Sequence, residues 1–171
     1  MTLIIVAVLI VTGVPAFSGL IQDNRIVTET NLLVASLNLA RSEAIKRNTQ
    51  VSISSASGTN NVWESGWTVF TDADGDGVLD DDGDANICEP GIDADCVLQV
   101  QSALAGGITL RSNGGYTTYL AFLPTGFIEG AVSNSDEFFL CGSDADTSMS
   151  RTIALNVTGR PQTSKGTTSC P

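Results

Sequence analysis

The side chains best able to do chemistry in this sequence lie in one acidic segment, residues 72–84, which reads DADGDGVLDDDGD. Carboxylates alternate with other residues at its start, as the oxygen ligands of Ca²⁺ do in an EF-hand loop. Gly77 stands where such a loop turns sharply. The candidate ligands, five carboxylates and one backbone carbonyl oxygen, belong to Asp72, Asp74, Asp76, Val78, Asp80 and Asp84. Because Ca²⁺ prefers such hard oxygen atoms, this segment is a candidate calcium site.

Two features of the segment depart from the EF-hand pattern. The acid that closes the loop should stand where the sequence has Gly83, and no helices of the EF-hand type are predicted on either side. The other interpretation is a solvent-exposed turn between strands, because Asp and Gly both tolerate tight turns. The sequence favours the plain turn and leaves Ca²⁺ open as a weakly bound cofactor.

The composition excludes several other kinds of site. The chain has no histidine, which rules out histidine-based triads and histidine-ligated zinc. We find no nucleophile with a partner base and no phosphate-binding loop, so the sequence predicts a protein that is not an enzyme. The formal net charge is −11, and ten of the 19 acids lie between Asp72 and Asp95. Such a charge repels nucleic acid and therefore argues against DNA as a partner.

Four cysteines stand outside any metal-ligand spacing and predict two disulfides in an oxidising compartment. Four cysteines allow three pairings, and we expect Cys88–Cys96 together with Cys141–Cys170. The first pair would close a short loop. The second would hold the C-terminal tail against the body of the protein, a contribution of roughly 3 kcal/mol.

The elements that must position these residues begin with an apolar run, residues 1–14, which no charge interrupts. A bilayer span needs about twenty such residues, and no basic residues precede the run as they do in a signal peptide. We therefore expect a truncated membrane span rather than a cleaved signal. Pro15 predicts a kink or a melted turn, because proline removes a backbone donor.

Helical periodicity resumes after Pro15 and continues to about Asn48. Apolar and small residues recur at spacings of four and three and form a single stripe, which predicts a helix packed by one side. The stripe consists of Ile26, Thr30, Leu33, Leu37, Ala40 and Ala44.

Short segments rich in β-branched and aromatic residues follow the helix, separated by Gly, Asn, Asp, Ser and Pro. The predicted strands are residues 51–57, 66–72, 96–100, 107–112, 116–123, 136–141 and 151–157. The turns at 113–115 (NGG) and 124–126 (PTG) predict antiparallel hairpins. One long helix and consecutive hairpins predict an α+β fold, with an antiparallel sheet against the helix stripe, and Trp63 and Trp67 are expected in the core.

Four motifs in this order resemble the GspH/FimT family of pseudopilins, which are type IV pilin-like proteins. Residues 32–53 contain ARSEAI, which is similar to the end of the family's helix, and residues 63–77 match its W..GW.VF.D..G.G hairpin. The FLPTGFI stretch at 122–128 resembles its F.P.G turn, and RTIALNVTGR at 151–160 resembles its closing strand. On this resemblance Arg41 and Glu43 are structural residues of the helix end rather than an acid–base pair.

The resemblance implies a lollipop-shaped subunit of a type IV pilus or of a type II secretion pseudopilus, at the tip or in priming. Residues 1–22 would be the half of the helix that lies in the membrane and then in the filament core, and residues 23–171 the periplasmic or extracellular head. The side chains implied in assembly are Leu3, Ile4, Val6, Leu9, Ile10, Val14 and Pro15. The implied partners are other pilins, the inner membrane of a Gram-negative bacterium, and the prepilin peptidase that cleaves and methylates the full-length precursor.

Two registers align the chain's start with the family's FTLIEL segment. If Pro15 matches the family proline, Met1 falls roughly seven residues inside the apolar helix, and a leader and a segment such as GFTLIEL lie upstream. If TLII at residues 2–5 matches TLIE, then Ile5 replaces the family's glutamate. We favour the first register, because the second also needs a deletion before Pro15.

A second class of function remains open, in which the head is a binding module at the filament tip for Ca²⁺-stabilised adhesion or for DNA uptake. Family members that bind DNA carry a basic GR.R tail. Here Gly159 and Arg160 match, but Pro161 and Gln162 follow and only Lys165 adds positive charge. Several cations are needed to bind duplex phosphates, so the sequence disfavours a DNA receptor.

Overall fold

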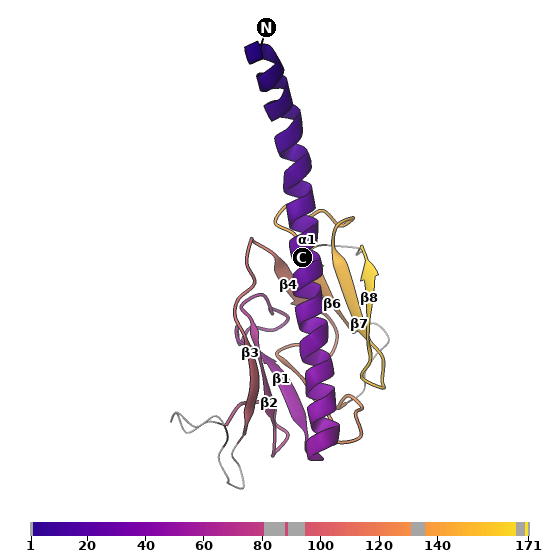
Figure 1. The fold of residues 1–171 in the computed structure, drawn as a ribbon. Helices are drawn as coiled ribbons and strands as arrows, with labels where there is room; N and C mark the ends of the chain where they lie inside the picture. The colour runs from indigo at the N-terminus through magenta and orange to yellow at the C-terminus, as the bar shows by residue number, and fades with distance from the viewer. Residues whose placement is uncertain (1, 81–87, 89–94, 131–135, 167–169, 171) are drawn as a thin grey trace.

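A computed structural model of the chain describes residues 2–80, 88, 95–130, 136–166 and 170, with the backbone alone for residues 2–18. One long helix, α1 (Thr2–Arg47), runs the whole length of the molecule. Its first half projects beyond the β-strands, and its second half lies along them (Figure 1). The helix is continuous through Pro15, so the melted turn expected there is absent.

The strands form two antiparallel sheets of four strands each. The first sheet has the order β3-β2-β1-β5 and the second has the order β4-β6-β7-β8. The strands of the first sheet are β1 (Val51–Ser55), β2 (Trp67–Thr71), β3 (Val97–Gln101) and β5 (Tyr119–Phe122). Those of the second are β4 (Thr109–Ser112), β6 (Glu137–Cys141), β7 (Arg151–Leu155) and β8 (Pro161–Lys165).

The α+β class and the seven predicted strands agree with this architecture, but three details of the prediction are wrong. The helix covers two sheets rather than one. The turn at 113–115 makes no hairpin, because β4 pairs with β6 while β5 pairs with β1. Strand β8 was not predicted, since its side chains are mostly exposed and carry no apolar pattern. The PTG turn does reverse the chain, and Phe122 bridges Ile128 across it.

The core lies between the helix and both sheets. All six residues of the predicted stripe are buried, from Ile26 to Ala44, with at most 3% of any of them exposed. Strands of both sheets contact α1. Trp63 and Trp67 are fully buried as expected, and the Trp63 ring meets Phe138 edge-on with the centroids 5.1 Å apart. The helix stripe therefore holds the two sheets together.

Two disulfides link Cys88 to Cys96 and Cys141 to Cys170, which is the pairing expected from the sequence. Cys96 directly precedes β3, so the first bond closes the connection between β2 and β3. Cys141 ends β6, so the second bond anchors the C-terminal tail to the middle of the second sheet.

Candidate functional site

The acidic segment starts at the end of β2 with Asp72, whose side chain is fully buried. The hydroxyl of Ser52 donates a short hydrogen bond to Oδ2 of Asp72. The backbone N–H of Gly77 also donates to Oδ2, at 3.1 Å, and that of Gly75 donates to Oδ1 at 2.7 Å. The charge of this carboxylate is thus already compensated by donors from its own loop and from β1.

Asp74 and Asp76 follow on the exposed side of the loop. Each carboxylate accepts a hydrogen bond from the backbone N–H two residues further along the chain. The N–H of Asp76 donates to Asp74 Oδ1 at 3.3 Å, and the N–H of Val78 donates to Asp76 Oδ1 at 2.7 Å. Carboxylate oxygens of Asp72, Asp74 and Asp76 lie within 4.8 Å of one another. Three of the candidate ligands therefore come together as a group that could hold a cation.

The remaining candidates behave differently. Asp80 is not part of this group, and its backbone N–H donates to Oδ2 of Asp95 at 3.0 Å. The side chain of Val78 is exposed, and Asp84 lies outside the described residues. Asp95 also contacts the loop, because its Oδ1 accepts the N–H of Ala73 at 3.1 Å.

Asp95 is a buried acid of this loop that the sequence analysis did not single out. It is buried, with 7% exposed, and burial raises the pKa of its carboxyl, while the charges of Asp72 and Asp80 act in the same direction. The EF-hand-like spacing of residues 72–84 could not point to Asp95, because Asp95 stands next to Cys96 at the far end of the connection between β2 and β3.

A second cluster joins three of the sequence motifs around Arg41, which lies on the helix. The Arg41 Nε–H points to two backbone carbonyl oxygens, that of Gly126 at 3.0 Å and that of Thr158 at 3.1 Å. Gly126 belongs to the PTG turn and Thr158 to the turn after β7. Glu43 instead pairs with Lys46 and Arg47, and the hydrogen bond from Arg47 is the main cause of a lowered Glu43 pKa. Arg41 and Glu43 are thus placed as structural residues.

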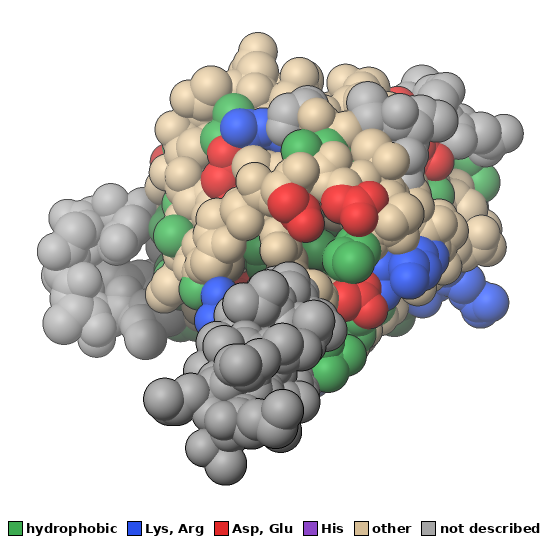
Figure 2. All heavy atoms as spheres, turned by 90° about the horizontal axis from the view of Figure 1, so that it is seen from above, with side chains coloured by type: hydrophobic (Ala, Val, Ile, Leu, Met, Phe, Trp, Pro, Cys, Tyr) green, Lys and Arg blue, Asp and Glu red, His purple; other side chains and the backbone are tan. Residues whose placement is uncertain are grey.

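The exposed end of the helix gives a third candidate site. Leu20 and Ile21 are 57% and 51% exposed where α1 leaves the head. Acidic, basic and hydrophobic side chains are interspersed around this point (Figure 2). Across the described residues, no helix combines the length and the apolarity that a membrane crossing requires.

A sequence model of the GspH family, described as type II transport protein GspH, matches residues 29–159. The chain belongs to the GspH family. The matched region contains Arg41, the acidic loop and β7, and it ends before β8.

Solved structures show the same fold. The chain is similar to the type IV minor pilin FimU of Pseudomonas aeruginosa, with 22% identity and a TM-score of 0.64 over 86% of this chain and 96% of FimU. A second crystal form of FimU gives a TM-score of 0.59 at 22% identity, over 82% of this chain and 96% of that one. A sequence comparison with curated proteins finds no match. The α+β pilin-like fold inferred from the sequence is thereby confirmed.

Proposed function

We propose that this GspH-family chain is a minor pilin or pseudopilin that primes a filament or caps its tip. The observation that carries the proposal is the helix, which continues for 46 residues and extends well beyond the head (Figure 1). Residues 1–22 would form the part that inserts among neighbouring helices, and residues 23–171 the head. The family match and the pilin-like fold support this assignment of an assembly half and a head.

The assembly half would serve in two surroundings of similar polarity. An inner membrane and a filament core both surround the helix with apolar groups, so moving from one to the other costs little hydrophobic free energy. The side chains proposed for this role are Leu3, Ile4, Val6, Leu9, Ile10 and Val14, with Pro15 at the boundary. The partners would be other pilins, with a prepilin peptidase acting on a longer precursor.

A charge in the assembly half tests this proposal in the native host. Leu9→Lys should remove the subunit from sheared filament or pseudopilus fractions, because a charged side chain at the centre of an apolar helix bundle is costly. Thr163→Lys is the matched control, since Thr163 is exposed on the edge strand β8. Immunodetection measures the amount of subunit in each fraction. Wild-type amounts of the Leu9→Lys subunit in those fractions would disprove the assembly role.

The grouping of Asp72, Asp74 and Asp76 favours a second proposal, that the loop binds Ca²⁺ and stabilises a head that contacts surfaces. Millimolar Ca²⁺ should then raise the thermal midpoint relative to chelator by binding only the native state. The paired variant Asp74→Asn with Asp76→Asn should abolish the shift.

A matched control for the calcium test lies in the turn after β6. Asp144 and Asp146 form the same kind of turn, with N–H groups donating to their carboxylates at 3.2 Å and 2.8 Å. Replacing both by Asn should leave the Ca²⁺ shift intact. An unchanged midpoint of the wild type in millimolar Ca²⁺, or an equal shift with Mg²⁺, would argue against the calcium site.

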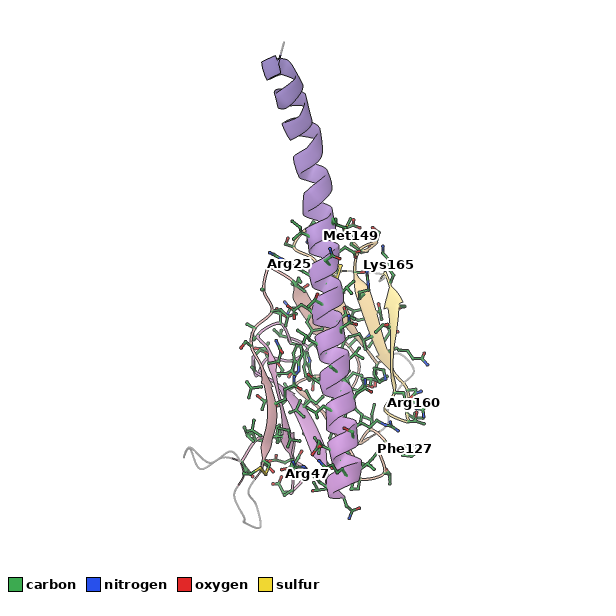
Figure 3. All side chains as sticks on the ribbon, viewed as in Figure 1. Arg25, Arg47, Phe127, Met149, Arg160 and Lys165 are labelled. Carbon is green, nitrogen blue, oxygen red and sulfur yellow. A yellow bond between two sulfur atoms is a disulfide. The ribbon has the colours of Figure 1, made fainter. Side chains whose placement is uncertain are left out.

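DNA uptake is the remaining alternative, and the positions of the basic residues argue against it. Arg25 and Lys165 lie toward the end where the helix leaves the head, whereas Arg160 and Arg47 lie toward the opposite end (Figure 3). Duplex binding needs several cations along one surface. We therefore expect no mobility shift of duplex DNA at physiological salt.

A further inference from the structure

Each sheet ends in two outermost strands, which have a neighbouring strand of the sheet on one side only. These strands are β3 and β5 in the first sheet and β4 and β8 in the second. The free backbone groups of such an edge can pair with an extended segment of another chain, so proteins usually cover or protect their sheet edges. The four edges of this molecule differ in their protection.

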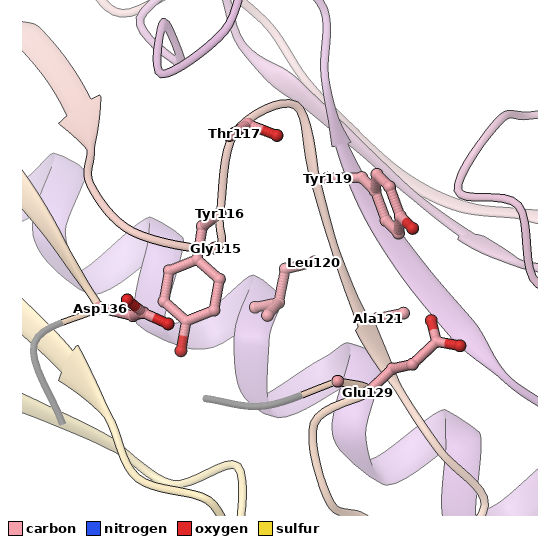
Figure 4. Close-up of a pocket in the computed structure, with 9 residues that line it drawn as sticks. Gly115, Tyr116, Thr117, Tyr119, Leu120, Ala121, Glu129 and Asp136 are labelled. Atoms are coloured by element: carbon pink, nitrogen blue, oxygen red, sulfur yellow. The ribbon is translucent and has the colours of Figure 1, made fainter. Parts of the chain in front are cut away.

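Two of the edges are covered by other segments of the chain itself. At β5, the backbone N–H of Glu129 donates to the carbonyl oxygen of Ala121 at 2.9 Å, and Figure 4 shows Glu129 beside Ala121. At β4, the backbone N–H of Trp63 donates to the carbonyl oxygen of Leu110 at 2.9 Å. Both strands therefore already have backbone partners on their outer side.

The other two edges differ in residue type. Strand β8 begins with Pro161, which has no backbone N–H, and ends with Lys165, whose charge opposes burial against a further strand. Strand β3 reads VLQVQ and contains neither proline nor a charged residue. It lies at the margin of the first sheet (Figure 1), and Val100 is 67% exposed, more than any other large hydrophobic residue that the structure describes. Strand β3 is therefore the edge that lacks these protections.

The backbone groups of Val97 and Val100 face away from β2. The N–H of Asp72, just after β2, donates to the residue before β1, so Phe70 and Thr68 also turn their backbone groups toward β1 by the alternation of an antiparallel pair. Phe70 and Thr68 lie opposite Val97 and Val100, whose N–H and C=O groups consequently point outward. A bulge between the two valines adds twist to β3 but does not pair these groups. Among the described residues they have no hydrogen-bond partner.

We propose that the outer side of β3 binds an extended segment of another protein, which joins the first sheet as an additional antiparallel strand. Main-chain hydrogen bonds to Val97 and Val100 would hold the segment, and the exposed side chain of Val100 would pack against it. The antiparallel direction follows from the sheet, in which β1, β2, β3 and β5 all pair antiparallel. This surface belongs to the head and does not depend on filament assembly.

The charges around β3 indicate the chemistry of the partner. Residues 97–110 carry no charged side chain, so the partner is expected to be uncharged along the strand. The acidic loop lies at the start of β3, because Asp95 stands two residues before the strand and its carboxylate accepts the N–H of Ala73. Asp74 and Asp76 are exposed in that loop, and no Lys or Arg of the described residues forms an ion pair with either. An antiparallel partner therefore carries Lys or Arg just after its own strand.

The test uses the full chain in detergent with chelator and follows backbone amide resonances by NMR. The probe is a synthetic peptide of alternating threonine and valine that ends in two lysines. It should shift the amide resonances of Val97 and Val100 and slow their hydrogen exchange. The amide of Thr163, on the protected edge strand β8, is the control and should not change. Unshifted resonances of Val97 and Val100 at the highest soluble peptide concentration would overturn the proposal.

Methylated peptides show whether the backbone carries the recognition. One version has a methyl group on the nitrogen of every threonine, and the other has it on the nitrogen of every valine. Because alternate residues of an added strand face its neighbour, one version should bind like the parent peptide and the other should lose binding. Equal effects of the two methylation patterns would mean that no strand is added.

The position of the lysines tests the direction of the strand. A peptide with the same residues but with both lysines at its N-terminal end should bind more weakly, because its charges would lie far from the acidic loop. The difference between the two peptides should shrink as the ionic strength rises. Tighter binding of the rearranged peptide would refute the antiparallel direction.

Variants of Val100 locate the contact on the chain. Val100→Pro removes an N–H that makes no bond to β2, so the fold should persist while peptide binding weakens about tenfold. Val100→Thr keeps the N–H and the β-branched shape and should change the affinity less than about twofold. If Val100→Pro lowers the thermal midpoint, Val100→Lys replaces it, since a charge on this edge should also weaken binding of the cationic peptide.

A folded Val100→Pro or Val100→Lys protein with wild-type affinity would refute the assignment to β3. Light scattering of the chain without peptide tests a second copy as the occupant. Self-association that Val100→Pro abolishes would assign the edge to contacts between copies and overturn the proposed partner. The formal net charge of −11 on each chain opposes such pairing, so we expect none.

Discussion

Replacing Arg41 by methionine should destabilise the head by about 2–3 kcal/mol, because Arg41 joins the helix to two turns that are distant in sequence. Its Nε–H lies 3.0 Å from the carbonyl oxygen of Gly126 and 3.1 Å from that of Thr158. One N–H carries a single proton, so the two contacts share it and their energies do not add in full. A charge-assisted hydrogen bond contributes about 1.5–3 kcal/mol, and the second, partly buried carbonyl adds a smaller penalty.

The assay is urea unfolding of the full chain in detergent, followed by tryptophan fluorescence. Trp63 and Trp67 are fully buried, so unfolding exposes both indole rings to water. A loss of 2–3 kcal/mol corresponds to a fall of roughly 5–10 °C in the melting temperature of a domain of this size. Arg41→Lys should lie between methionine and the wild type, because lysine keeps the charge but lacks the Nε–H.

Arg47 provides the matched control on the same helix. It pairs with Glu43 at 2.6 Å, but its side chain is 39% exposed. An exposed pair of this spacing contributes little to stability, so Arg47→Met should lower the free energy of unfolding far less than Arg41→Met does. If Arg41→Met proves as mild as Arg47→Met, the role assigned to Arg41 in joining the three motifs is refuted.

Three further predictions concern backbone, disulfide and pH. Gly159→Ala should lower the free energy of unfolding in urea by about 3 kcal/mol, because φ is 72° and a Cβ would lie 2.7 Å from the Gly126 carbonyl oxygen. Gly166→Ala is the control and should cost only about 1 kcal/mol, because φ is 89° but no atom lies closer than 3.7 Å to the added Cβ. Equal costs would contradict the close approach at Gly159. Cys170→Ser should lose about 3.5 kcal/mol, the loop-closure value for a separation of 29 residues, and a loss below 1 kcal/mol in the same assay would show that the tail needs no anchor. Because burial raises the pKa of Asp95 above 3.8, its contribution to stability is present below that pH and is lost as the pH rises through its native pKa. The wild type should therefore lose stability relative to Asp95→Asn between pH 4 and 7, and parallel curves would contradict the shift.

Much of the fold was predictable from local patterns. The stripe from Ile26 to Ala44 was predicted from the helical spacing of its apolar and small residues, and every member of it is buried. The seven predicted strands were found because each carries its own β-branched or aromatic signal. Strand β8 was missed for the same reason, since an edge strand that is mostly exposed needs no apolar pattern, only the backbone of β7 to pair with.

The candidate sites were less predictable. The spacing of Asp72, Asp74 and Asp76 alone predicted them as candidate ligands, and in the structure their carboxylate oxygens lie close together. The structure also brings Asp95 to the loop, where its carboxylate accepts the N–H groups of Ala73 and Asp80, although Asp95 follows only after the whole connection between β2 and β3. No sequence window could contain that information.

The sequence by itself determined the long helix, its buried face, the strand segments other than β8, and the family, because these depend on periodicity and motifs within a few tens of residues. Only the tertiary structure decided the division into two sheets, the carbonyl partners of Arg41 and the hydrogen bonds that join Asp95 to the acidic loop. The physical reason is that each of these joins groups from separate segments of the chain, such as Arg41 and Thr158, 117 residues apart. Which distant groups meet is decided by the packing of the whole core, and local residue preferences do not carry that choice.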